Sequence, residues 1–228
     1  MRALVLESRG KVQLCEIPEP KPKEREVLVK VDQAAICGSD IALFTGKREG
    51  KYPLILGHEG IGHIIDIGSE VDSSVLGSRV VFEPNIPCGT CPTCIGGNSV
   101  VCPQIKRIGI DTPGCFAGIV SIDVDYAWEI PEKVHWRNAV TIEPFGVSVK
   151  ALRTAEVFPG DSLLIIGCGN EGLLMTMLGA ETGINVSVVD KNPKRLKLAQ
   201  KYGAINTYLP EELNGKSELS LAVIEAAG

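Results

Sequence analysis

The chain has 228 residues, of which 44% are hydrophobic, so it can bury the core of one large or two small domains. Its 23 basic and 28 acidic residues give a formal net charge of −5, which disfavours a nucleic-acid partner. The apolar run at 3–6 is too short for a secretory signal, and the later runs are too short to cross a bilayer. We therefore expect a cytoplasmic chain with reduced thiols and no membrane partner.

The first part of the chain predicts an irregular β domain. Short apolar runs, in which Val27, Val29 and Val31 alternate with other residues, are interrupted by proline and glycine. The pattern changes near residue 150, where the apolar residues take on the period of helices between strands. The sequence therefore predicts two domains, at 1–150 and 151–228.

The motifs CGSD and GHEGIGH contain candidate metal ligands. His58 and His63 lie five residues apart, which does not fit the i, i+4 spacing of two zinc ligands on one helix. A better partner for His58 is Cys37, because a sulfur, an imidazole and a carboxylate form an open three-ligand zinc site. Taken singly, Cys37 also fits a small buried hydrophobic residue, and His63 or His135 an ordinary hydrogen-bonded histidine.

A cluster of four cysteines with the spacing C-x2-C-x2-C-x7-C comes next. Its members are Cys88, Cys91, Cys94 and Cys102. Four thiolates with no open position describe a closed, structural zinc site. A disulfide lobe is disfavoured in a cytosolic chain. A nucleic-acid-binding zinc module is also disfavoured, because no lysine or arginine occurs in the cluster before Lys106.

A helix over about 144–155 is predicted to link the two domains, since proline suits a first helical turn and PGD at 159–161 ends the helix. The following segment reads strand, glycine turn, helix, strand, helix, strand. Its apolar strands at 163–166 and 186–189 are of the buried type. This order predicts a parallel sheet built from βαβ units.

The turn GCGNEG supplies the spacing G-x-G-x-x-G through Gly167, Gly169 and Gly172. Between a strand and a helix, such a turn lets the backbone approach a pyrophosphate at the helix N-terminus. Asp190, 18 residues beyond Gly172, can accept hydrogen bonds from ribose hydroxyls and would repel a 2′-phosphate. This favours NAD over NADP, although Lys191 and Arg195 nearby leave NADP open. A glycine turn that binds nothing is the less favoured alternative.

Glu171 is an unusual residue in this turn. Its charge faces the region of the phosphates, where an apolar side chain would normally pack, but it also suits the helix dipole. The sequence leaves open which effect prevails.

These motifs, in this arrangement and at these separations, resemble the zinc-containing medium-chain dehydrogenase/reductases of the alcohol dehydrogenase superfamily. The resemblance extends over essentially all 228 residues. It is closest to the polyol or sorbitol-type sugar alcohol branch, because IEPFGVSVKAL places Glu143 where other alcohol dehydrogenases carry a cysteine ligand. The resemblance implies a mixed fold, with a GroES-like domain at 1–150, a structural zinc lobe at 88–102 and a partial Rossmann domain at 151–228.

The resemblance also implies roles for individual residues. Cys37, His58 and Glu143 would hold a catalytic zinc, with Glu59 as an occasional or indirect ligand. Asp40 would orient His58, and Ser39 would take the proton of the substrate. The four clustered cysteines would hold the second zinc. The turn glycines, Asp190 and Arg195 would bind NAD.

The implied reaction is hydride transfer between a small secondary alcohol and NAD, with two zinc ions per chain and a homo-oligomer, a dimer or tetramer, as the complete form. Threonine-type 3-hydroxy amino acids are the runner-up substrates to polyols. The chain ends after LAVIEAAG, which resembles a fourth Rossmann strand, so we expect a C-terminally truncated chain. A catalytically silent zinc-binding fragment or partner is the alternative. In a truncated chain, the strand at 221–224 would form an unprotected apolar edge, which favours self-association.

Overall fold

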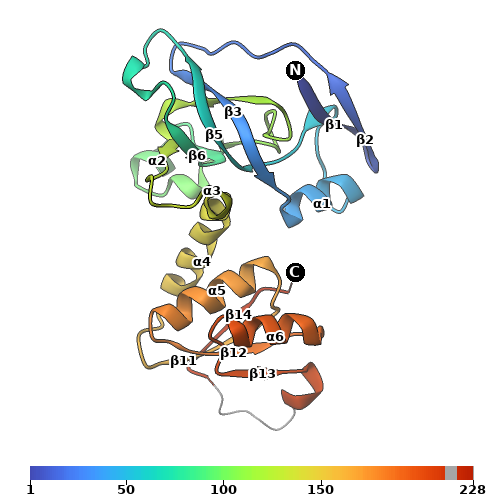
Figure 1. Cartoon of the computed structure of the whole chain (residues 1–228), viewed down its shortest axis with the longest axis vertical. Coiled ribbons are helices and arrows are strands. Elements are labelled where there is room, and N and C mark those ends of the chain that lie inside the picture. The colour runs from blue at the N-terminus through green and yellow to red at the C-terminus, as the bar shows by residue number, and fades with distance from the viewer. Residues whose placement is uncertain (214–219, 228) are drawn as a thin grey trace. The chain divides into compact units, whose positions relative to one another are not determined.

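The computed structural model describes residues 1–213 and 220–227. The chain forms two compact units, Met1–Glu143 and Pro144–Gly228, so the division falls before the boundary expected at 150 (Figure 1). The reason is the linking helix α4, which spans Ile142–Thr154 and contributes most of its length to the second unit.

The first unit is built mainly from antiparallel strands. Its larger sheet has the order β10-β6-β5-β3-β9, and a second sheet has the order β2-β1-β4. The bounds are β1 Arg2–Ser8, β2 Lys11–Glu16, β3 Glu26–Ala35, β4 Leu54–Ile55, β5 Glu59–Ile67, β6 Arg79–Phe82, β9 Ile119–Asp123 and β10 Ala127–Glu129. This arrangement of antiparallel strands confirms the predicted irregular β domain.

The short elements of this unit lie between the strands. They are α1 Gly38–Thr45, η1 Ser73–Val75, β7 Asn85–Ile86, α2 Pro92–Ile95, η2 Ser99–Val101, β8 Lys106–Arg107, η3 Val124–Tyr126 and α3 Trp136–Ala139. The core is closed by β3, on which Val27 and Val29 are fully buried as their alternation predicts. Leu28, between them, is 5% exposed, so the opposite face of β3 is covered at this position as well.

The second unit is a four-stranded parallel sheet with helices. Its strand order is β13-β12-β11-β14, in which Ile165 is paired with Val188 on one side and with Ile224 on the other. The bounds are β11 Ser162–Ile166, α5 Asn170–Glu181, β12 Asn185–Val189, α6 Pro193–Lys201, β13 Asn206–Tyr208, η4 Pro210–Leu213 and β14 Ala222–Glu225. The order is that of the first four strands of a dinucleotide-binding fold, which confirms the predicted partial Rossmann domain.

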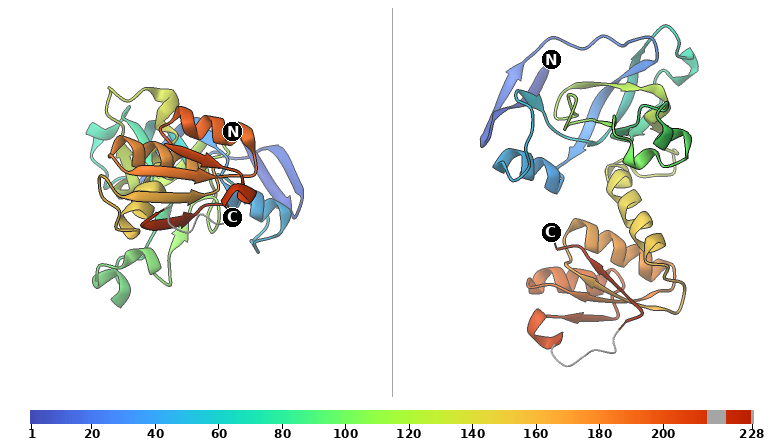
Figure 2. Two further views of the ribbon diagram at one scale, coloured as in Figure 1. Left: turned by 90° about the horizontal axis from the view of Figure 1, so that it is seen from below. Right: turned by 180° about the vertical axis from the view of Figure 1, so that it is seen from behind.

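The helices of this unit cover its strands closely. α5 and α6 contact each other, and both pack on β12, while the strands lie side by side (Figure 2). Leu163, Ile165, Val186 and Val188 are fully buried beneath them. Within the described residues, no helix is long and apolar enough to cross a membrane.

Candidate metal centres and cofactor turn

The four clustered cysteines converge in the structure. Their sulfurs lie within 4.8 Å of one another, and the measured contacts run from 3.5 Å between Cys91 and Cys94 to 4.0 Å between Cys88 and Cys94. A tetrahedral zinc with Zn–S bonds of about 2.3 Å holds its sulfurs about 3.8 Å apart. The geometry of this lobe therefore fits a four-thiolate zinc ion.

The surroundings of the four thiols shift their pKa values in different directions. The N–H groups of Thr90 and Cys91 lower the pKa of Cys88 to about 6. Burial, together with Cys91 and Cys102, raises the pKa of Cys94 to about 12. Because zinc binds thiolates, the ion must displace the proton that Cys94 carries near neutral pH.

A second cluster joins Cys37, His58 and Glu59. One ligand atom from each lies within 4.8 Å of the other two, and both His58 and Glu59 are buried. The structure thus brings together the cysteine, the histidine and one of the two carboxylates expected from the sequence. Among the described residues, Glu143 is not part of this group, and it lies in the first turn of α4.

Asp40 ties the two segments that carry these ligands. Its Oδ2 accepts a hydrogen bond of 2.9 Å from the N–H of Cys37, and its Oδ1 accepts one of 3.2 Å from the N–H of Gly57. The same carboxylate lies 3.6 Å from Nδ1 of His58. Asp40 is 3% exposed, so these contacts replace water and fix the spacing between the two loops.

The electrostatics of the cluster suit a cation. Burial acts to lower the pKa of His58, but its polar interactions with the nearby Asp40 and Cys37 outweigh burial and raise the pKa to about 10. Burial raises the pKa of Glu59. In the metal-free chain, a proton on His58 therefore offsets the surrounding negative charge, and a bound metal ion would take over that role.

The turn before His58 is packed so tightly that only glycine fits. Gly57 has a φ of +92°, and a Cβ there would lie 2.3 Å from the ring of Phe116. Gly109 and Gly114 press against the carbonyl of Gly57, with Cβ positions 2.5 and 2.2 Å from its oxygen. Gly109, Gly114 and Phe116 are not among the residues predicted from the sequence. The isolated glycines in IGIDTPGC were the available signal for close backbone approach.

Ser39 lies beside the metal cluster. Its Oγ is 3.5 Å from Nε2 of His58, and it belongs to the first turn of α1, for which Cys37 is the N-cap. His63, in contrast, lies on β5 and contacts Asp32 at 2.5 Å, outside the cluster. A strand rather than a helix at this position explains why GHEGIGH does not form a two-histidine metal site.

The glycine turn follows β11 and opens α5 as expected. Gly167 has a φ of +96°, and a Cβ on Gly172 would lie 1.9 Å from the carbonyl oxygen of Gly167, so both positions require glycine. Gly169 is the N-cap of α5, and no atom lies within 4 Å of its Cβ position. The turn therefore leaves open space at the N-terminus of a helix of 12 residues, which fits a pyrophosphate.

Asp190 directly follows β12 and is hydrogen-bonded to the turn. Its Oδ2 accepts from the N–H of Cys168 at 2.7 Å, and its Oδ1 accepts from the N–H of Asn192 at 2.7 Å. Arg195 lies 3.6 Å from the same carboxylate, with a half-exposed side chain. A carboxylate has about four acceptor positions, so Asp190 can hold the turn and still accept ribose hydroxyls.

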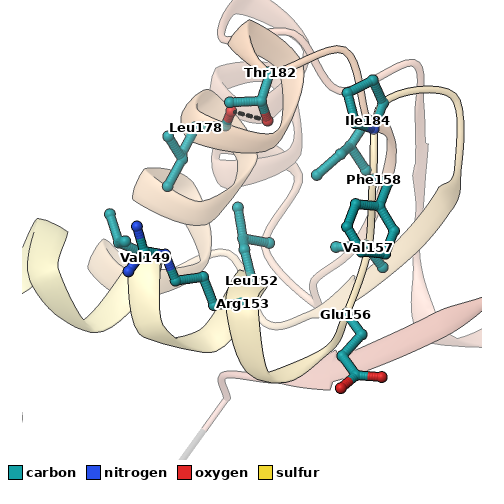
Figure 3. Close-up of a pocket in the computed structure, with 10 residues that line it drawn as sticks. Val149, Leu152, Arg153, Glu156, Val157, Phe158, Leu178, Thr182 and Ile184 are labelled. Atoms are coloured by element: carbon teal, nitrogen blue, oxygen red, sulfur yellow. Dashed lines mark hydrogen bonds between the residues drawn. The ribbon is translucent and has the colours of Figure 1, made fainter.

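A separate pocket lies within the second unit. It has a volume of about 510 Å³, and Leu152 of α4 and Leu178 of α5 point into it, whereas the carboxylate of Glu156 points away (Figure 3). None of its lining residues belongs to the metal clusters or to the glycine turn. This pocket is therefore not the candidate catalytic site.

The chain is similar to known proteins of one enzyme family. A family described as alcohol dehydrogenase GroES-like domain matches residues 23–132. Sorbitol dehydrogenase of Bacillus subtilis is 34% identical over 227 residues, which are 96% of this chain and 64% of the relative. L-threonine 3-dehydrogenase of Bacillus velezensis is 35% identical over 213 residues, which are 91% of this chain and 61% of the relative.

A solved structure is similar throughout. An alcohol dehydrogenase from Escherichia coli CFT073, complexed with NADH, superposes with a TM-score of 0.94 at 32% identity. The match covers 100% of this chain and 69% of that one. The chain thus spans roughly three fifths of the length of the curated relatives, at 64% and 61%.

Proposed function

Because the chain belongs to the zinc-containing medium-chain dehydrogenases of the alcohol dehydrogenase superfamily, we propose that it carries the metal centre and the adenine-side cofactor site of an NAD-dependent oxidoreductase. The substrate is a small secondary alcohol, a polyol or a sugar derivative. The observation that carries this proposal is the cluster of the partly exposed Cys37 with the buried His58 and Glu59, with Asp40 behind it. Such a donor set with an open position is typical of catalytic rather than structural zinc.

Each residue of the site has a distinct task. When bound, zinc lowers the pKa of an alcohol oxygen and NAD accepts the hydride. Cys37 and His58 hold the metal, and Asp40 fixes the distance between their loops. Ser39 would accept the proton of the alcohol while passing its own hydroxyl proton on through the cofactor ribose towards water, and its Oγ lies 3.5 Å from the ring of His58.

The third protein ligand is a carboxylate. Glu59 has a ligand atom within 4.8 Å of those of Cys37 and His58, which supports it as the ligand in this arrangement. Glu143 is the residue that the family resemblance favours. If Glu59 is the ligand, Glu59→Gln should release this zinc and Glu143→Gln should leave the zinc content unchanged. If Glu143 is the ligand, the two results should be reversed. Cobalt substitution provides the readout, because its visible spectrum reports the ligand set.

The cofactor is bound by the second unit. The glycine turn receives the pyrophosphate at the N-terminus of α5, and Asp190 accepts the ribose hydroxyls. Asp190 would repel a 2′-phosphate, so NAD is preferred over NADP. In the protein that contains this chain, Asp190→Ala should narrow the ratio of kcat/KM values for the two cofactors. A wild-type preference for NADP would contradict this role.

Two measurements test the proposed function. Elemental analysis should find two zinc ions per folded chain, and Cys37→Ser should leave one. The protein that contains this chain should oxidise sorbitol or a related polyol with NAD, and Ser39→Ala should lower kcat more than it raises KM. One zinc or fewer, with Cys37 freely alkylated, would contradict the catalytic centre.

The runner-up activity is threonine 3-dehydrogenation. It is favoured by the 35% identity to an L-threonine 3-dehydrogenase. Comparing kcat/KM for sorbitol and for L-threonine distinguishes the two. Two bound zinc ions without turnover of either alcohol would instead identify a silent zinc-binding protein.

A further inference from the structure

A pocket in the first unit takes no part in the proposed catalytic site. Its volume of about 560 Å³ falls within the range of about 300–1,000 Å³ that is typical of small-molecule sites. Its walls come from the segment between β2 and β3, from β4 and β9, and from β7 and β8, which flank the four-cysteine lobe at 88–102. None of its lining residues belongs to the two metal clusters. We call it the isoleucine pocket, after Ile17, Ile55, Ile86, Ile108 and Ile119, which line it.

The isoleucine pocket is an apolar recess rather than an exposed apolar patch. Ile108 is 2% exposed, and the other four isoleucines are half-buried. Pro18, Pro20 and Pro113 also line it, and their rings add apolar wall without a backbone N–H donor. Water is poorly held against such walls, so an apolar ligand group that displaces it gains free energy.

The two carboxylates of the pocket are engaged within the fold. Glu26 lies 2.7 Å from the ammonium group of Lys23, and it accepts a hydrogen bond of 2.8 Å from the hydroxyl of Ser121. Asp123 accepts a hydrogen bond of 3.0 Å from the N–H of Asp125 at the start of η3. Neither carboxylate therefore needs a ligand to satisfy it.

Two lysines of the pocket are not engaged in this way. Within residues 1–213 and 220–227, the side chains of Lys21 and Lys106 make no ion pair and no hydrogen bond. Both are exposed, so they lie at the mouth of the pocket, Lys21 on the segment between β2 and β3 and Lys106 on β8. An anionic group at this mouth meets two cations that no described residue neutralises, although the chain as a whole has a net charge of −5.

We propose that the isoleucine pocket binds a small amphipathic anion, a medium-chain carboxylate. The alkyl tail lies against the isoleucines, and the carboxylate faces Lys21 and Lys106 at the mouth. A polyol fits poorly, because its hydroxyl groups would lose hydrogen bonds to water against the apolar walls. A free inorganic anion has no apolar part to fill the recess. The ligand therefore differs in chemistry from the alcohol proposed for the metal centre.

Isothermal titration calorimetry with octanoate tests the proposal on the zinc-loaded protein that contains this chain, without NAD. Octanoate should bind with a dissociation constant below about 1 mM. Decanoate should bind more tightly, by about fourfold for each added CH₂ group that is buried. Octanamide has the same tail without the charge, so it should bind more weakly than octanoate. Added salt should weaken the binding of octanoate and leave that of octanamide unchanged.

Substitutions locate the site. Lys21→Glu with Lys106→Glu should raise the dissociation constant of octanoate about tenfold and leave that of octanamide unchanged. Lys133→Glu, at an exposed lysine that does not line the pocket, is the matched control. Ile17→Glu places a carboxylate in the wall and should weaken both probes, whereas Val12→Glu, at an exposed position on β2, should weaken neither.

A carboxylate can also coordinate zinc, so the titration is repeated on Cys37→Ser, which we expect to lack the zinc of the metal centre. Octanoate should bind this variant as it binds wild type. Loss of binding in Cys37→Ser would place octanoate on the metal and overturn the proposal. So would a wild type that shows no saturable binding, equal affinities for octanoate and octanamide, or a Lys133→Glu variant that weakens binding as much as the lysine pair does.

Discussion

Asp40 does more in the metal centre than orient the imidazole of His58. It accepts hydrogen bonds from the N–H groups of Cys37 and Gly57, so removing it frees both ligand-bearing loops. We expect Asp40→Ala to weaken zinc binding at this centre about 10–100-fold. Competition with a chromogenic chelator measures the affinity. Asp32→Ala, which removes the carboxylate partner of His63, is the matched control and should leave the affinity unchanged.

The lowered pKa of Asp190 makes the stability of the fold depend on pH. Burial acts to raise the pKa of this carboxyl, but the N–H groups of Cys168 and Asn192 and the charge of Arg195 lower it below the ordinary value of 3.8. Because the folded-state pKa is lowered, the ionised group stabilises the fold above the ordinary value, and this contribution is lost as the pH falls through the folded-state pKa.

We therefore expect Asp190→Asn to lower the free energy of unfolding at about pH 7 and to have a smaller effect at about pH 3. Denaturant titrations at the two pH values give the comparison. An equal loss of stability at both would show that the charge of Asp190 does not contribute.

The glycine turn and α5 form an element whose packing can be tested directly. A Cβ on Gly172 would collide with the carbonyl oxygen of Gly167, which belongs to backbone that cannot easily move. We expect Gly172→Ala to destabilise the second unit by about 1–3 kcal/mol. Gly146→Ala in α4 is the control. No atom lies within 4 Å of its Cβ position, so the better helix former should stabilise by about 0.5–1 kcal/mol. Thermal unfolding followed by circular dichroism distinguishes the two, and an equal loss from both would contradict this packing argument.

The same elements show what the sequence could predict. β11 and β12 were expected at 163–166 and 186–189 and lie at Ser162–Ile166 and Asn185–Val189, because apolar runs and a glycine turn are local signals. The four-cysteine lobe was predictable for the same reason. The expected third ligand was not settled, since Glu59 and Glu143 are both plausible in sequence, and the choice depends on how the turn at Gly57 directs the chain.

A polypeptide limited to residues 1–228 would carry the adenine side of the cofactor site. The described sheet has the order β13-β12-β11-β14, whereas a doubly wound dinucleotide fold continues with two further strands. In a polypeptide of residues 1–228, NAD would be held by its adenine half, so the nicotinamide ring would not be oriented towards the alcohol. Such orientation can contribute about 7–11 kcal/mol to catalysis. We expect this polypeptide to bind zinc without measurable polyol oxidation, and robust NAD-dependent turnover by it would contradict the expectation.

The two metal centres differ in how far apart their ligands lie along the chain. The lobe needs only the segment from Cys88 to Cys102, so it can close on a metal while the rest of a newly made chain is still unfolded. The centre at Cys37 must wait for Phe116, Gly109 and Gly114 to pack against the turn at Gly57. During synthesis the lobe should therefore bind zinc before the Cys37 centre does. During partial unfolding the Cys37 centre should lose its zinc first. In mild denaturant a chelator should remove one zinc, at the Cys37 centre, well before the other.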